Sequence, residues 1–167
     1  ILWHQGESDS NNSLHKTYYE KLSLIIETLR KELNLQNVPL IIGELGDFLG
    51  KTGFGKYSTE FQEINEQLRR FAHEQQNCYF VSAEGLTANP DGIHLNAVSQ
   101  RKFGYRYFEA FSKKCHILEP LSDENQSLKI KNNYSKTEQI YIHSMNLALG
   151  KITYAEFEAQ MAKVMQP

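Results

Sequence analysis

The feature that most constrains the fold of this sequence is the alternation of short apolar runs with longer amphipathic segments. Three apolar runs are continuous, as in strands covered on both faces, and they lie at 1–3, 38–45 and 78–83. Three further segments carry apolar residues at three- and four-residue steps, which predicts helices at about 13–33, 58–76 and 96–114. Ser13 is the expected N-cap of the first of these helices. This order predicts an α/β fold, in which a parallel sheet carries helices on its faces.

The C-terminal part of the chain has a different pattern. Residues 119–134 ("EPLSDENQSLKIKNNY") are polar and lack periodicity, so we expect a linker there after a main domain at 1–118. Residues 135–167 predict a helical tail of two short helices, at about 135–149 and 154–165. Gly150 suits a helix C-terminus, and Thr153 with Glu156 fits a capping box. The tail would pack as an amphipathic pair on the domain or on a partner.

Composition and charge exclude several classes of function. The formal net charge is −2, and the basic residues are scattered among acidic ones, so we expect no binding to nucleic acid or to an anionic membrane. No apolar run approaches the ~20 residues of a membrane helix. Cys78 and Cys115 do not have metal-ligand spacing and are expected to be free thiols. The glycine-rich segment 46–58 lacks phosphate-loop spacing, which favours a mobile surface loop near the site.

Two polar clusters follow the first and third predicted strands. The first is "WHQGE" at 3–7 and the second is "PDGIH" at 90–94. Because the carboxyl ends of parallel strands meet at one edge of a sheet, we expect both clusters on the same rim. In the second cluster, Asp91 can accept a hydrogen bond from Nδ1 of His94, which would leave Nε2 free to act as a general base.

The first cluster suits stabilisation of an oxyanion. The Gln5 amide offers N–H donors, Gly6 allows the backbone to approach a ligand closely, and Glu7 could serve as a second acid. Structural explanations stay open for each residue. An Asp-x-x-His motif can be an ordinary turn with a solvated histidine, Glu7 could cap the following loop, and Gln5 could satisfy buried backbone groups.

Taken together, "WHQGESD" and "DGIHLNAVSQRKFGYRYFEAF" resemble the SGNH-hydrolase superfamily over about residues 1–114. Within it, they are similar to the sialate O-acetylesterase and acetylxylan esterase group, known as carbohydrate esterase family six. The resemblance implies a flavodoxin-like, three-layer α/β/α fold and no metal or organic cofactor. It implies that His94 is the general base, Asp91 its orienting acid and Gln5 the oxyanion side chain, with Gly6 beside it. Glu7 matches a carboxylate that acts as, or alongside, the triad acid, so both acids remain candidates.

The sequence departs from the family pattern at the nucleophile. The family carries its serine in a Gly-Gln-Ser block before the His-Gln-Gly-Glu block, whereas only Ile1 and Leu2 precede Trp3 here. Ser8 and Ser10 lie on the downstream loop and are not expected to replace it. We therefore expect an N-terminally truncated fragment with an incomplete parallel sheet, inactive alone, whose partner is the missing N-terminal segment of the same domain.

Two functions follow from this sequence, and a third stays open. The first is part of a serine esterase that removes O-acetyl groups from an acetylated carbohydrate. The alternative is a non-catalytic module that binds glycan or docks a partner. A complete doubly wound domain with unrelated chemistry is a third and weaker interpretation. The sequence does not indicate which sugar, compartment or oligomeric state applies.

Overall fold

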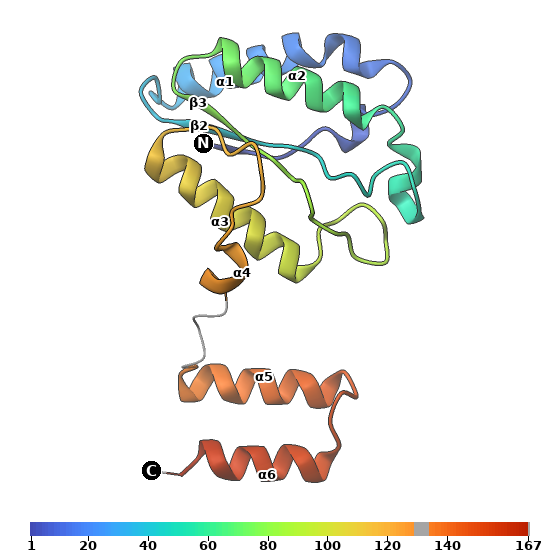
Figure 1. Ribbon diagram of the computed structural model, residues 1–167, viewed down its shortest axis with the longest axis vertical. Coiled ribbons are helices and arrows are strands. Elements are labelled where there is room, and N and C mark those ends of the chain that lie inside the picture. The colour runs from blue at the N-terminus through green and yellow to red at the C-terminus, as the bar shows by residue number, and fades with distance from the viewer. Residues whose placement is uncertain (129–133, 167) are drawn as a thin grey trace. The chain divides into compact units, whose positions relative to one another are not determined.

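The structure is a computed structural model that describes residues 1–128 and 134–166. The chain forms two compact units, Ile1–Leu128 and Lys129–Pro167. Figure 1 shows the sheet and helices of the first unit and the helix pair of the second.

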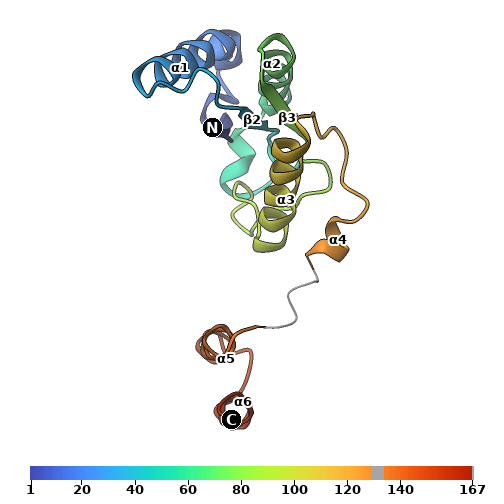
Figure 2. The same ribbon diagram turned by 90° about the vertical axis from the view of Figure 1, so that its left-hand side faces the viewer.

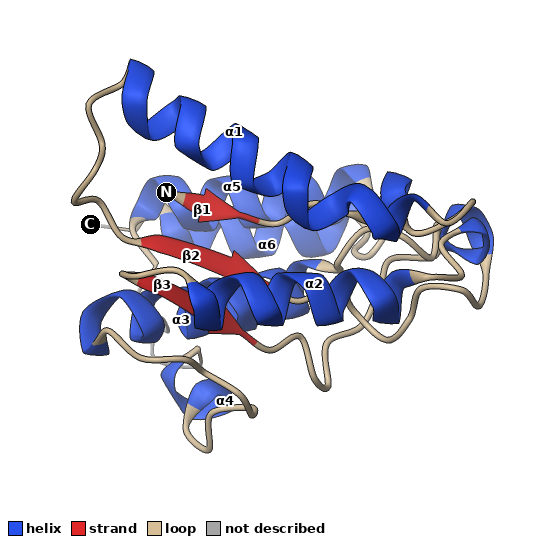
Figure 3. Cartoon of the chain, turned by 90° about the horizontal axis from the view of Figure 1, so that it is seen from above, coloured by secondary structure: helices blue, strands red, loops and turns tan. Residues whose placement is uncertain are grey.

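The first unit is built on a parallel sheet, as the sequence predicts. Its described strands are β1 (Leu2–Trp3), β2 (Leu40–Gly43) and β3 (Cys78–Val81), in the order β1-β2-β3. Leu2 pairs with Ile41, and Leu40 pairs with Cys78. Figure 3 shows β2 between its two neighbours. The prediction of a parallel α/β arrangement is confirmed.

Helices cover both faces of this sheet. α1 (Tyr18–Glu32) and α2 (Phe61–Glu74) lie on one face, and α3 (Ala97–Lys113) lies on the other (Figure 2). Successive side chains of a strand point to opposite faces. Leu40 and Ile42 accordingly pack in the core under α1 and α2, whereas Ile41 packs with residues of α3. Coverage on both faces explains why β2 is a continuous apolar run.

The start of the first helix differs from the prediction. Leu14–Thr17 form a 3-10 turn and α1 begins only at Tyr18. Ser13, the expected N-cap, has φ 59° and its side chain makes no capping hydrogen bond, so that prediction is wrong. Its backbone N–H instead donates to the carboxylate of Glu60, 2.8 Å away. A contact distant in sequence has replaced the local cap.

The expected linker is partly a structured element of the first unit. Residues 119–128 belong to that unit and contain a short helix, α4 (Glu124–Ser127). The linker prediction was wrong for this stretch because the side chain of Glu124 is buried against Arg106 of α3. Residues 129–133 of the expected linker lie outside the described residues.

The second unit is a helical hairpin, as expected for the tail. α5 (Lys136–Ala148) and α6 (Tyr154–Val164) pack against each other. The capping box of Thr153 with Glu156 is present, and Gly150 has the positive φ of 65° that suits a helix C-terminus. No helix in the described part of the chain has both the length and the apolar character to cross a membrane.

Candidate active site

The loop 82–96 connects β3 to α3 and carries the Asp91–His94 pair. His94 Nδ1 lies 2.9 Å from Asp91 Oδ2, and the other carboxylate oxygen accepts the backbone N–H groups of His94 and Ile93, each at 3.0 Å. The backbone N–H of His94, its ring and the N–H of Ile93 together hold the pKa of Asp91 at about 2. An ionised carboxylate only accepts hydrogen bonds, so Nδ1 carries the proton and Nε2 is left free.

The glycine-rich loop packs directly against this pair. The backbone N–H of Phe54 donates to the carbonyl of Asp91 at 2.7 Å. A Cβ on Gly53 would stand 2.0 Å from that carbonyl oxygen, and one on Gly92 would stand 2.2 Å from the carbonyl oxygen of Thr52. Glycine is therefore required on both sides of the contact. The expectation that segment 46–58 lies near the site is confirmed for the part that touches Asp91.

The other polar cluster is held rigidly at the end of β1. Gly6 has φ +150°, and a Cβ there would stand 2.7 Å from Ile64 Cγ2. Its N–H donates to Glu7 Oε2 at 3.1 Å, and its carbonyl accepts the buried hydroxyl of Ser10 at 2.7 Å. Tyr18 Oη donates to the backbone carbonyl of Gln5 at 2.6 Å, and burial raises the pKa of this phenol above its usual range.

A surface hollow of about 380 Å³ brings parts of the two clusters together. The residues that line it come from the loop after β1, from loop 82–96 and from α3: His4, Glu7, Asn89, Ile93, His94, Leu95 and Gln100. Glu7 and His94 thus share one hollow, as predicted. Gln5 and Gly6, although described, are not among its lining residues, so the structure does not bring the Gln5 side chain into it.

Two polar lining residues, Asn89 and Gln100, were not predicted from the sequence, whereas His4 belongs to the first predicted cluster. Asn89 adjoins the second cluster, so proximity in sequence could have indicated it. Gln100 lies in the first turn of α3, and no local pattern distinguishes it from other surface residues of that helix. None of the described lining residues carries a hydroxyl or a thiol. Ser10 is fully buried and donates to Gly6, which excludes it as a nucleophile in this arrangement.

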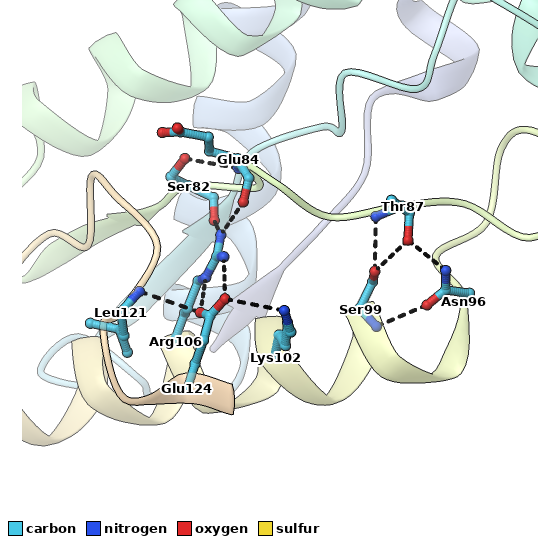
Figure 4. Close-up of polar contacts among 9 residues, drawn as sticks. All are labelled: Ser82, Glu84, Thr87, Asn96, Ser99, Lys102, Arg106, Leu121 and Glu124. Carbon is cyan, nitrogen blue, oxygen red and sulfur yellow. Dashed lines mark hydrogen bonds and ion pairs between the residues drawn. The ribbon is translucent and has the colours of Figure 1, made fainter. Parts of the chain in front are cut away.

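Loop 82–96 is tied to the start of α3 by a polar network (Figure 4). Ser99 Oγ accepts the backbone N–H of Thr87 at 2.8 Å, and Asn96 Nδ2 donates to Thr87 Oγ1 at 2.6 Å. Asn96 also caps α3 by accepting the N–H of Ser99. The helix N-terminus therefore holds the middle of the loop between β3 and His94.

An apolar groove of about 610 Å³ adjoins the hollow. Its lining includes Leu2 of the edge strand and Phe108 and Phe111 of α3, which are 70%, 59% and 55% exposed. His4 and Gln100 line both the groove and the hollow, so these two residues form a wall that the two share. Large apolar side chains gathered in one exposed groove are typical of an interaction surface.

The described residues hold no cluster of His, Cys, Asp and Glu that could bind a metal ion. Cys78 is buried and Cys115 half-buried, and both are free thiols, as predicted. Burial raises the pKa of the Cys78 thiol to about 12, so it is not a reactive thiolate.

Comparison with known proteins agrees with these motifs. Residues 1–113 match a family described as carbohydrate esterase, sialic acid-specific acetylesterase. A probable carbohydrate esterase of Arabidopsis thaliana is 28% identical over 113 residues, which cover 66% of this chain and 39% of that relative. Both polar clusters and the hollow between them lie within the matched residues, whereas α4, α5 and α6 lie beyond them. This chain therefore belongs to the carbohydrate esterase family of sialic acid-specific acetylesterases.

Proposed function

We propose that this chain forms one part of the active site of a serine esterase that removes O-acetyl groups from carbohydrate, as in sialate O-acetylesterases or acetylxylan esterases. The observation that carries the proposal is the Asp91–His94 pair, whose imidazole lines a hollow that Glu7 also lines. The proposed frame is an SGNH-type three-layer α/β/α domain, of which β1 to β3 and their helices form a part.

In the proposed reaction, Nε2 of His94 accepts the proton of a serine hydroxyl as its oxygen attacks the acetyl carbonyl. Collapse of the tetrahedral intermediate breaks the ester bond, and the imidazolium returns the proton to the departing sugar oxygen. Water then attacks the acetyl-enzyme with His94 again as the base, which releases acetate and restores the serine. Asp91 stabilises the imidazolium in both steps.

The oxyanion would be bound by the Gln5 carboxamide, with Gly6 allowing close approach. The Gln5 side chain is exposed at the end of β1, two residues from Glu7 in the hollow. The Gly6 N–H already donates to Glu7, so the backbone contribution requires the Glu7 carboxylate to move. Glu7 stays a second candidate for the triad acid beside Asp91, although Asp91 is the carboxylate that bonds the imidazole.

The serine would come from polypeptide outside these 167 residues that occupies the apolar groove. The groove supports this because it shares His4 and Gln100 with the hollow, so a segment seated there reaches the imidazole side. The chain spans about two fifths of the length of its Arabidopsis relative, which leaves room in that protein for such a segment.

The test uses the full-length protein encoded by the gene, with 4-nitrophenyl acetate and O-acetylated sialic acid as substrates. His94→Ala should lower kcat/KM by about 10³-fold or more, because it removes the general base. His15→Ala is the matched control: His15 also bonds a carboxylate, Glu60 at 3.0 Å, but does not line the hollow. Full activity of the His94 variant would remove His94 from the mechanism. Glycan binding without any turnover by the unsubstituted protein would instead replace the esterase by a non-catalytic binding module.

A further inference from the structure

A buried ion pair connects α4 to α3, and its arginine also binds the start of loop 82–96, which carries Asp91 and His94 (Figure 4). Arg106 of α3 is fully buried and binds Glu124 through two nitrogens, with Nε to Oε2 at 2.8 Å and the second guanidinium nitrogen to Oε1 at 2.9 Å. Burial by itself would raise the pKa of Glu124, but the Arg106 bonds hold it below its usual range. The pair is therefore ionised at neutral pH.

The third nitrogen of Arg106 binds the root of loop 82–96. It donates to the carbonyl oxygens of Ser82 at 2.8 Å and Glu84 at 2.9 Å, directly after β3 ends. From the other side, the Glu44 carboxylate accepts the hydroxyl of Ser82 at 2.8 Å and the N–H of Ala83 at 2.9 Å. The chain leaving β3 is thus held by charged groups on both sides.

From this geometry we infer that Arg106 and Glu124 are positioning residues for the Asp91–His94 pair. Glu124 fixes the plane of the guanidinium, and the guanidinium fixes the two carbonyls from which the loop departs. The catalytic meaning of this role rests on the proposed function, but the positioning itself does not. If Glu124 positions the pair in this way, α4 contributes to the geometry of the site although it lies beyond residue 113, where the family match ends.

Stability alone does not account for this pair. A buried ion pair is often replaced by apolar residues of similar size without loss of stability, because desolvation offsets the attraction between the charges. No apolar residue, however, can donate to the carbonyls of Ser82 and Glu84. A double apolar replacement therefore separates the two roles, since it removes both charges and leaves the loop root unpaired.

The experiment uses the 167-residue chain with Arg106→Met combined with Glu124→Leu. We expect the double variant to fold, with about tenfold faster amide hydrogen exchange within 82–96 and a rise of the Asp91 pKa from about 2 towards its ordinary value. Carboxyl ¹³C shifts of Asp91 would follow the titration. Tyr105→Phe is the control, because it removes the 2.9 Å bond from α3 to Asp123, the residue before α4, and the 3.3 Å bond from the Ser127 hydroxyl, without touching the loop.

A folded double variant with unchanged exchange and an unchanged Asp91 titration would overturn the inference. If the double variant does not fold, native-state hydrogen exchange on the parent chain decides the question. Positioning requires that the amides of 121–128 and of 82–96 open as one cooperative unit, and independent opening would refute it. Neither measurement depends on esterase activity, so failure of the His94 assay and failure of this inference are distinguishable.

Discussion

At the residue scale, the Asp91 carboxylate carries the strongest local constraint of the candidate site. It accepts hydrogen bonds from two backbone N–H groups and one imidazole, all within a four-residue turn. The bonds within this turn join His94 to Asp91 locally, which is why sequence spacing alone could predict the pair, whereas the position of the turn depends on contacts with other elements. The same bonds link the folding of the turn to the ionisation of Asp91.

The lowered pKa of Asp91 predicts that the free energy of unfolding falls with pH in the acid range. Its folded pKa of about 2 is below the unfolded value of about 3.9, so its contribution is present above pH 4 and is lost as pH falls from about 4 to 2. Asp91→Asn should remove this part of the acid destabilisation. Urea unfolding midpoints of both proteins between pH 5 and pH 2 would test it, and parallel curves would contradict it.

In the cluster at 3–7, the close packing around Gly6 predicts that a larger residue there would destabilise the fold. Gly6→Ala places a Cβ 2.7 Å from Ile64 Cγ2 at a φ of +150°, so we expect a loss of about 1–3 kcal/mol in the free energy of unfolding. Gly104→Ala is the matched control, since a Cβ there meets nothing within 4 Å and a helix interior favours alanine by roughly 0.5–1 kcal/mol. Equal effects of the two substitutions in urea unfolding would refute the argument.

At the scale of elements, the pattern of apolar residues predicted the strands and long helices of the first unit, because the helices bury one apolar face and the central strand β2 is buried on both of its faces. α4 was missed for the opposite reason. Its four residues are polar, and its place depends on the contact of Glu124 with Arg106, eighteen positions away in sequence. The prediction of an N-cap at Ser13 was wrong for a similar reason, because the backbone N–H of Ser13 donates to the distant carboxylate of Glu60. Gln100 could not be predicted, since the hollow exists only after α3 packs beside β1.

We expect loss of the Thr153 cap to destabilise only the helical hairpin of the second unit. Thr153→Ala removes the bonds of the Thr153 hydroxyl to the Glu156 backbone and carboxylate, which should destabilise α6 by about 1 kcal/mol. Because the hairpin is a compact unit of its own, faster amide exchange should be confined to α5 and α6. Equal acceleration in α1 to α3 would show that the two units unfold together.

At the scale of the whole molecule, the apolar groove beside β1 should determine how the 167-residue chain behaves in solution. We expect the isolated chain to bind a hydrophobic dye and to self-associate, because exposed apolar surface is removed from water on association. Phe108→Ser combined with Phe111→Ser should reduce dye fluorescence several-fold and lower the mass measured by light scattering.

Phe54 provides the matched control for this prediction. It is 71% exposed, more than either groove phenylalanine, but it lies outside the groove lining. Phe54→Ser should therefore leave dye binding and the measured mass nearly unchanged. A monomeric chain with no dye binding would contradict the proposal that the groove receives another stretch of polypeptide.

The buried pair of Arg106 and Glu124 has a practical consequence for anyone who expresses this domain. If the expressed chain ended where the family match stops, at residue 113, it would lack Glu124. The fully buried guanidinium of Arg106 would then have no counter-ion. Loss of one member of such a pair costs about 3–5 kcal/mol, a large share of the stability of a small domain. A shortened version of the first unit should therefore end no earlier than Leu128.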